Sequence, residues 1–300
     1  LAKRNKDLSL LWNERSLFKR GNKKKLMDYR FFTLAMLWGA GVDMRHLPEP
    51  QQKTWISPTA ITPVALMRTS WDDTKAIYLA FKGGSASSSH AHLDAGSFVM
   101  VANGERWAMD FGRQDYHSLE SLGLDIWNKT QDSDRWKVFR YTNLAHNTLT
   151  FNNCMQDVKG YVCLVGTSSF ANNRPSVSAD LTPVYPGQVK SAKRQVEIVD
   201  GKYVLVSDEI HTGKKSTTMR WTMLTPSDAK LKGKNKIVLN RNGKRLVMEV
   251  SAPVKVRLKT WSTSPTTSYD APNPGTVLVG FESTLPANSH YKFRVKLIPE

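Results

Sequence analysis

From about residue 64 to the C-terminus, the sequence is a succession of short strand-like runs, and this succession constrains the fold more than any other feature. No helical periodicity separates the runs, and Asn103–Gly104 and Asn242–Gly243 mark two tight hairpins. Strands at this spacing predict an antiparallel β-sandwich over residues 64–300. The expected strands are residues 65–68, 76–81, 97–102, 105–110, 147–151, 196–199, 203–209, 217–224, 237–240, 245–250, 254–259, 275–282 and 291–298.

The first 45 residues have a different, helical pattern. A second expected helix, from about Leu26 to Trp38, carries apolar residues around much of its circumference and stops at Gly39–Ala40–Gly41. Such a helix must be buried against other helices, which one or two helices cannot do alone. Residues 1–45 are therefore predicted to be the last helices of a larger helical domain. Four prolines make residues 46–63 the expected linker.

The charge balance indicates an acidic partner. The chain has 43 Lys and Arg against 26 Asp and Glu, a formal net charge of +17. Such a surface attracts nucleic acid, anionic lipid or an acidic polysaccharide, although lysines also serve solubility. The sequence shows no zinc-finger spacing, RNA-binding signature or helix-turn-helix pattern, so nucleic acid is not expected. No apolar run is long enough for a membrane span. No signal peptide is apparent, and the chain is expected to be a mature segment or a C-terminal piece.

The sequence from Ser87 to Phe98 contains the most conspicuous candidate site, because His90 and His92 stand two residues apart. On an extended backbone the two imidazoles point to the same face. Hairpin pairing brings Asp110 back toward them, and His146 begins a later strand. Two histidines and an aspartate are plausible zinc ligands. The alternatives are solvated histidines in a serine-rich loop and a metal-dependent hydrolase site.

Three ordered motifs carry a family resemblance: residues 88–98 (SSHAHLDAGSF), 107–112 (WAMDFG) and 141–149 (YTNLAHNTL). Together they resemble the C-terminal part of the heparinase II/III-like polysaccharide lyases, from about Leu26 to the end and most closely over residues 84–151. The resemblance implies an (α/α) toroid followed by a multilayered antiparallel β-sandwich, or supersandwich. Residues 1–45 would then be the end of a truncated toroid. It also implies an acidic, uronate-containing polysaccharide as substrate and a periplasmic or secreted location.

The resemblance also implies residue roles. His90 matches the histidine that lines the cleft. One structural zinc ion is expected, and Asp94 is expected to be a structural turn residue and not a zinc ligand. The matching zinc ligands are His92, Asp110 and His146. The family's carboxylate-neutralising residue and its principal tyrosine belong to the toroid, outside this chain.

The implied reaction is β-elimination, in which a base removes the C5 proton beside a uronate carboxylate and an acid protonates the leaving O4. Cationic side chains stabilise the charge that develops. Around the motifs the chain offers Tyr116 and Tyr141 for proton transfer, besides His90, and Arg113 and Arg140 for substrate binding. For each of these four, a surface charge or a buried ring is the alternative.

Other neighbours of the motifs are expected to be structural. We expect a structural role for Arg135, and we expect Trp107, Trp127 and Trp136 to lie in the core rather than to stack on sugars. Two further functions stay open from the sequence. One is a non-catalytic, zinc-stapled sandwich that binds acidic glycan or a partner domain, and the other is a zinc-dependent hydrolase.

Overall fold

The computed structural model describes residues 1–16, 27–28, 30–167 and 174–300, and it divides the chain into two compact units, Leu1–Lys53 and Thr54–Glu300. In the first unit, η1 (Leu8–Ser16) is a 3₁₀ helix and α2 (Phe32–Gly39) is an α-helix that ends at the expected glycine. No residue of α2 is buried among the described residues, and Leu37 and Trp38 are 69% and 67% exposed. The expected first turns of that helix fall partly outside the described residues. No helix in the described ranges is long and apolar enough to cross a membrane.

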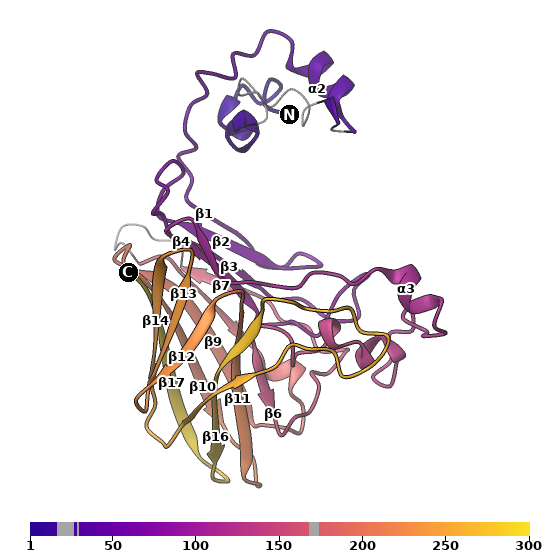
Figure 1. Cartoon of the computed structure of the whole chain (residues 1–300), viewed down its shortest axis with the longest axis vertical. Helices are drawn as coiled ribbons and strands as arrows, with labels where there is room; N and C mark the ends of the chain where they lie inside the picture. Colours follow the sequence, from indigo (N-terminus) through magenta and orange to yellow (C-terminus); the bar gives the residue numbers. More distant parts are fainter. Residues whose placement is uncertain (17–26, 29, 168–173) are drawn as a thin grey trace. The chain divides into compact units, whose positions relative to one another are not determined.

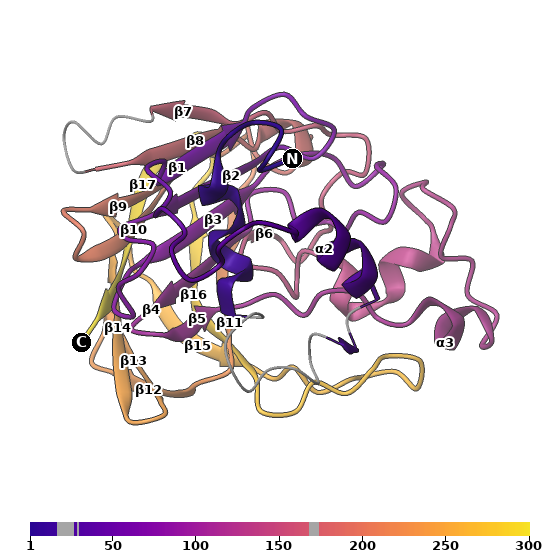
Figure 2. The same ribbon diagram turned by 90° about the horizontal axis from the view of Figure 1, so that it is seen from above.

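The second unit is built from antiparallel sheets, as predicted (Figure 1). In the described residues these are a five-stranded, an eight-stranded and a four-stranded sheet. The five-stranded sheet, whose strands lie side by side in Figure 2, has the order β1 (Thr54–Ser57), β2 (Val64–Arg68), β3 (Tyr78–Lys82), β4 (Phe98–Ala102), β5 (Glu105–Ala108). The eight-stranded sheet has the order β12 (Asp228–Lys232), β13 (Lys236–Arg241), β14 (Lys244–Ser251), β17 (His290–Pro299), β10 (Tyr203–His211), β9 (Ser191–Val199), β8 (Ser176–Asp180), β7 (Val165–Thr167). The four-stranded sheet has the order β15 (Arg257–Trp261), β16 (Val277–Leu285), β11 (Thr217–Thr225), β6 (Leu149–Phe151).

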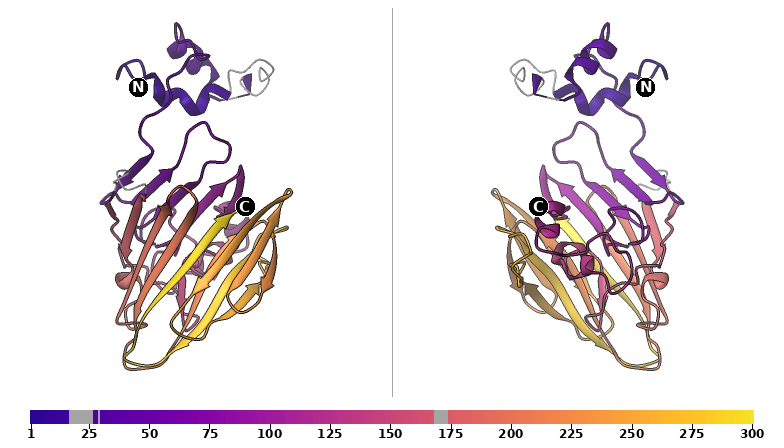
Figure 3. Two further views of the ribbon diagram at one scale, coloured as in Figure 1. Left: turned by 90° about the vertical axis from the view of Figure 1, so that its left-hand side faces the viewer. Right: turned by 90° about the vertical axis from the view of Figure 1, so that its right-hand side faces the viewer.

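The eight-stranded sheet buries one face and leaves much of the other accessible. Along β9, Ala192, Val196 and Ile198 are buried while Lys193 and Gln195 are exposed, which is the alternation expected of a sheet with one solvated face. Buried apolar residues from all three sheets form one continuous hydrophobic cluster. Figure 3 shows the long strands of this sheet on one side of the unit and the loops around α3 (Tyr116–Glu120) on the other. The predicted mainly-β sandwich is therefore confirmed.

A buried ion pair joins the sheets inside this core. Arg194 of β9 donates to Asp208 of β10 at 2.7 and 3.1 Å, and neither side chain is exposed. Trp221 of β11 donates its indole N–H to the same carboxylate at 3.0 Å. Arg194 also donates to the carbonyl oxygens of Gly96 and Asn147, each at 2.9 Å. Each of these contacts satisfies a buried polar group, as burial of a charge requires.

Both Asn-Gly hairpins form where they were expected. Asn103 and Gly104 have φ of 54° and 74° between β4 and β5, and Asn242 and Gly243 have 49° and 75° between β13 and β14. Two consecutive positive φ values define the turn that this dipeptide favours. Four strands had no matching expectation, namely β1, β7, β8 and β12. Of these, β1 lies within the range expected as linker, where it pairs with β2.

Candidate active site and metal-binding group

The loop between β3 and β4 and the segment between β5 and β6 carry the predicted site residues, and they share a second, small hydrophobic core. Leu93, Leu119 and Ile126 are fully buried in this second core. Three short helices interrupt the segment, and they are α3, η2 (Asp134–Lys137) and η3 (Phe139–Tyr141). These loops lack regular hydrogen-bond ladders. The second core fixes their backbone and so positions their side chains.

The His90–Ala91–His92 turn sends its two imidazoles to different places. His90 has a φ of 59°, in the left-handed region that few residues other than glycine adopt. The backbone is thus not extended here, and the expectation of one shared face is wrong. His90 is exposed, whereas His92 is 9% exposed and packs between the rings of Tyr141 and His146, at 4.5 and 5.4 Å.

A buried arginine holds this turn. Arg135 is 3% exposed and donates from Nε and Nη2 to the carbonyl oxygen of Ala91, at 3.1 and 2.8 Å. Its Nη1 donates to the carbonyl oxygen of Ile126 at 3.2 Å, and its guanidinium lies 4.6 Å from the centre of the Tyr141 ring. The peptide between the two histidines is therefore clamped from the interior.

His90, Tyr116 and Trp127 form an accessible cluster at the surface. His90 Nδ1 lies 3.1 Å from Tyr116 Oη, and the two rings stack at 5.5 Å. Trp127 meets both rings edge-on, at 5.5 and 5.1 Å, and remains 46% exposed. Arg113, with 65% of its side chain exposed, lies 5.7 Å from the centre of the Tyr116 ring. These residues place a hydrogen-bonded pair, an aromatic surface and a cation at one position.

The prediction that Trp127 lies in the core is wrong. Trp107 and Trp136 are buried as expected, at 0% and 5% exposure. Trp127 instead lies in a polar stretch, residues 125–134, and donates its indole N–H to Glu120 at 2.6 Å. That polar surrounding is the signal that distinguishes it from the two core tryptophans.

Two predicted site residues, Tyr141 and Arg140, are hydrogen-bonded to loops of the protein. Tyr141 is fully buried and donates its hydroxyl to the carbonyl oxygen of Gln114 at 3.1 Å, and burial raises its pKa. Arg140 donates from Nε to Asn273 at 2.9 Å and from Nη2 to the carbonyl oxygen of Pro272 at 3.0 Å. These hydrogen bonds give both side chains a positioning role in the loops, while the catalytic role of Tyr141 and the substrate-binding role of Arg140 stay predictions.

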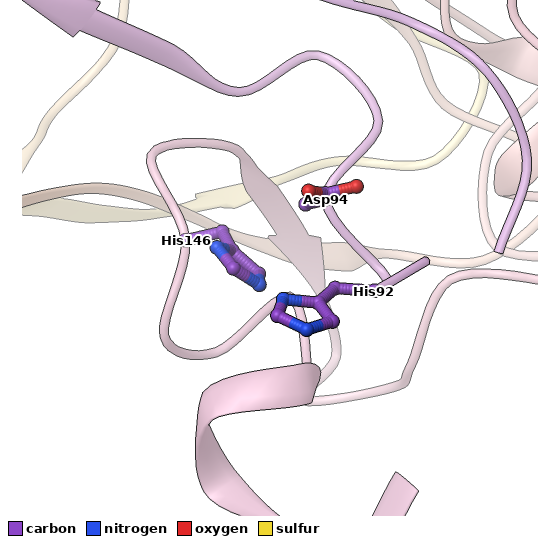
Figure 4. A group of neighbouring side chains, drawn as sticks. All are labelled: His92, Asp94 and His146. Carbon is purple, nitrogen blue, oxygen red and sulfur yellow. The ribbon is translucent and has the colours of Figure 1, made fainter. Parts of the chain in front are cut away.

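The buried histidines form a potential metal-binding group with Asp94. One ligand atom from each of His92, Asp94 and His146 lies within 4.8 Å of the others (Figure 4). Asp110, which the sequence placed in this group, instead lies against the other side of His146, with Oδ2 2.7 Å from Nδ1. His146 Nε2 is buried without a hydrogen-bond partner among the described residues. Because Asp110 accepts the Nδ1 proton, the neutral ring keeps a free lone pair on Nε2.

The pKa shifts of His92 and Asp110 suit a cation, whereas the shift of His146 favours a protonated ring, whose proton a bound ion would displace. Burial and the neighbouring His146 lower the pKa of His92 to about 3, so this imidazole is neutral at pH 7. Burial raises the pKa of Asp110, but the charge and hydrogen bond of His146 outweigh this effect and lower it below its ordinary value. The same contact raises the pKa of His146 against the effect of burial. Lys82 donates to both oxygens of Asp94, at 2.6 and 2.5 Å, and thus shares this carboxylate with any bound ion.

The donor set fits zinc. Two imidazoles and a carboxylate are normal zinc ligands, and a carboxylate on the far nitrogen of a ligating histidine is the usual device that orients the ring. Asp110 has that outer position, while Asp94, assigned to a turn from the sequence, contributes to the donor group.

Comparison with known proteins identifies the family. The family model for the C-terminal domain of heparinase II/III-like proteins matches residues 65–279. The chain therefore belongs to the heparinase II/III-like family, in the part that forms its C-terminal domain. No protein with a curated description matches the chain in sequence.

Solved structures share the fold at low sequence identity. A mutant of heparan sulfate lyase HepC from Pedobacter heparinus matches with a TM-score of 0.66 and 17% identity, over 98% of this chain and 42% of that one. A heparinase III matches with a TM-score of 0.67 and 14% identity, over 94% and 43%. A heparinase III with methylated lysines matches with 0.66 and 16%, over 93% and 41%. The chain thus spans less than half the length of these structures.

Proposed function

We propose that the chain is the C-terminal part of a polysaccharide lyase that cleaves a uronate-containing glycan by β-elimination. The observation that carries the proposal is the pair of exposed His90 and half-buried Tyr116, joined at 3.1 Å beside Trp127 and Arg113. Membership of the heparinase II/III-like family and the net charge of +17 support an acidic glycan as substrate.

His90 and Tyr116 are the proposed proton-transfer groups. A base removes the C5 proton, its electron pair forms the C4=C5 double bond, and the C4–O4 bond breaks as O4 takes a proton. Nδ1 of His90 is engaged by Tyr116, which leaves Nε2 of an exposed ring for substrate. A positioned proton transfer of this kind contributes about 10²- to 10⁴-fold to the rate.

Trp127 and Arg113 are the proposed substrate contacts. An indole that is 46% exposed offers an apolar face to a sugar ring, and its neighbour Tyr116 lies edge-on to it. Arg113 places a cation beside Tyr116, where it would oppose the negative charge of a uronate or sulfate. Further neutralising groups are proposed to come from the (α/α) toroid domain, of which the first unit would be the end. The exposed apolar side chains of α2 would pack against that domain.

A single structural zinc ion is proposed at the buried histidine group. His92 and His146 would hold it with Asp94, and Asp110 would orient His146. The ion would connect the turn after His90 to the start of β6. It would therefore help to position the residues that line the cleft. A periplasmic or secreted location is proposed from the family resemblance alone.

An absorbance assay tests the proposal. Elimination creates an unsaturated uronate, so ultraviolet absorbance should rise when the protein, together with its toroid domain, meets heparin, chondroitin sulfate or alginate. His90→Ala should abolish the rise while zinc content stays unchanged, because the exposed imidazole is separate from the buried group. His117→Ala, at an exposed histidine of α3, is the matched control and should leave the rate unaltered.

Three outcomes would contradict parts of this proposal. Absence of new absorbance on every acidic glycan would exclude a lyase and favour a glycan-binding sandwich. Cleavage without unsaturated products, abolished by a chelator, would indicate a hydrolase. Loss of zinc in His90→Ala would show that the proposed division between the two histidines is wrong.

A further inference from the structure

We propose that Glu209, His211 and His290 form a second, surface-exposed binding site for a transition metal of the zinc class. The three residues lie on β10 and β17, in the middle of the eight-stranded sheet. Asp208 and Ile210 of β10 are fully buried. Because side chains alternate along a strand, Glu209 and His211 face outward, away from the core.

The register of the sheet places the three donors together. His211 and His290 are direct partners in the β10–β17 ladder, and Glu209 precedes His211 by two residues on the same face. The two imidazole rings stack with centroids 3.9 Å apart. Glu209 Oε1 lies 3.1 Å from Nε2 of His290 and 3.6 Å from Nε2 of His211. One ligand atom from each residue lies within 4.8 Å of the others.

This donor set is chemically selective. Imidazole nitrogen suits zinc, copper and nickel, and two imidazoles with one carboxylate leave further coordination positions open to water or a ligand. The side chains of His211, Glu209 and His290 are 38%, 39% and 51% exposed, so an ion reaches them without opening the fold. The site thus differs in accessibility from the buried group around His146.

The backbone that carries the donors is rigid. Thr212, which follows His211, is 2% exposed, and its hydroxyl donates to the carbonyl oxygen of Pro286 at 2.6 Å. The amide of Thr212 donates to Ser289, next to His290, at 2.9 Å, and the amide of Ser289 donates back to the Thr212 hydroxyl at 2.9 Å. The ends of β10 and β17 are therefore tied together beside the two histidines, so little order is lost when an ion binds.

Two lysines set an upper limit on affinity. Lys193 of β9 and Lys292 of β17 are the cross-strand partners of Glu209 and share its face. Their charges repel a cation and compete for the carboxylate. This predicts a site of moderate affinity that tightens when one of these charges is removed.

Zinc content and calorimetric titration of the metal-stripped full chain with Zn²⁺ alone test the site. His290→Ala and His211→Ala should each bind one equivalent less than the wild-type chain, and Lys292→Gln should bind about fivefold more tightly, the effect of one unit charge a few ångströms away in water. His46→Ala is the matched control, because His46 is an exposed histidine that contacts one carboxylate, Asp43, at 2.8 Å. It should retain the wild-type stoichiometry.

The zinc stoichiometry distinguishes this surface site from the buried group around His146. If both sites bind, the wild-type chain takes two equivalents and His290→Ala takes one. If only the surface site binds zinc, the wild-type chain takes one equivalent and His290→Ala takes none, which also supports the inference. Equal zinc content in the wild-type, His211→Ala and His290→Ala chains would overturn the inference, as would weaker binding by Lys292→Gln.

Discussion

At the scale of single residues, one backbone angle separates two neighbouring histidines. The φ of 59° at His90 turns its ring to the surface, while His92 enters the interior. Arg135 stabilises that arrangement through its two hydrogen bonds to Ala91. A fixed turn of this kind is what a cleft histidine needs, because catalysis depends on placement to within a fraction of an ångström.

The Arg135→Lys substitution should therefore slow the proposed reaction, although the side chain at this position does not contact substrate. Lysine cannot reproduce the planar fork that reaches Ala91 and Ile126 together. We expect kcat to fall by roughly 100-fold, the cost of a displacement of about 1 Å, with little change in KM. The measurement is steady-state kinetics in the absorbance assay. Lys137→Gln, at an exposed residue of the same helix η2, is the control. A change confined to KM would argue for a direct contact with substrate instead.

Tyr185 gives a pH-dependent prediction. Its buried hydroxyl donates to the carbonyl oxygen of Leu149 at 2.6 Å and accepts from Gln156 at 2.9 Å, and burial raises its pKa from 10.0 to about 12. The folded state thus holds this proton more tightly than the unfolded state. Its contribution is complete below pH 10 and is lost as the pH rises toward 12.

Urea unfolding of Tyr185→Phe across this pH range tests that prediction. At pH 8 the variant should be less stable by about 1–2 kcal/mol, because hydrogen bonds of a buried group are lost. The difference from the wild-type protein should shrink above pH 10. Tyr291→Phe, at a half-buried tyrosine of β17, controls for the loss of a tyrosine. A difference that stays constant with pH would contradict the proposed cause.

At the scale of elements, a single buried asparagine connects two sheets. Asn147 donates from Nδ2 to the carbonyl oxygens of Phe98 on β4 and Met109, at 2.6 and 2.9 Å. Its Oδ1 accepts from the amide of Leu224 on β11 at 2.5 Å. These bonds supply partners to backbone groups that no strand ladder satisfies. The asparagine is adjacent to His146, so it also fixes the start of β6 at the buried histidine group.

Asn147→Leu should destabilise the β-sandwich unit strongly. Leucine has a similar volume but leaves the three backbone groups without partners, each costing about 1–3 kcal/mol. We expect a loss of at least 3 kcal/mol in the free energy of unfolding, measured by denaturant titration. Asn235→Leu, at an exposed asparagine before β13, should change stability by less than about 0.5 kcal/mol. Equal effects at both positions would show that the hydrogen bonds of Asn147 contribute little.

At the scale of the whole molecule, the β-sandwich unit has its own core. Both hydrophobic clusters draw their buried residues from position 65 onward. The buried ion pair of Arg194 and Asp208 also lies entirely within this unit. A unit with a complete core and satisfied buried charges folds independently of other segments.

A chain of residues 54–300 should therefore fold alone. We expect the same cooperative thermal transition as in the full chain, with Tm within about 2 °C, because both hydrophobic clusters lie within this unit. Circular dichroism during heating measures this. A chain of residues 65–300, which also lacks β1, is the comparison and should melt at a lower temperature, since β2 loses its edge partner. Aggregation of the 54–300 chain on expression would show that its stability depends on the first unit.

The sequence predicted the parts of this fold that depend on local chemistry. Asn103–Gly104 and Asn242–Gly243 predicted their hairpins because few residue pairs adopt two positive φ values. Most strands were predicted because one face of each must be apolar. Short β7 and lysine-rich β12 were missed, since their pairing depends on neighbours distant in sequence. For the site, the motifs predicted which segments meet but not how their side chains turn.

By itself, the sequence determined the mainly-β class, the family and the meeting of the His90, Asp110 and His146 segments, because periodicity, turn residues and motifs are local properties. Only the tertiary structure decided that the side chains of His90 and His92 point in different directions and that Asp94 lies beside the buried histidines. It also decided that Tyr141 and Arg140 are hydrogen-bonded to loops. It also decided that Trp127 reaches the surface and that Glu209, His211 and His290 converge. Side-chain direction and burial depend on the packing of segments far apart in the chain, so local patterns such as the polar surroundings of Trp127 indicate them only in part.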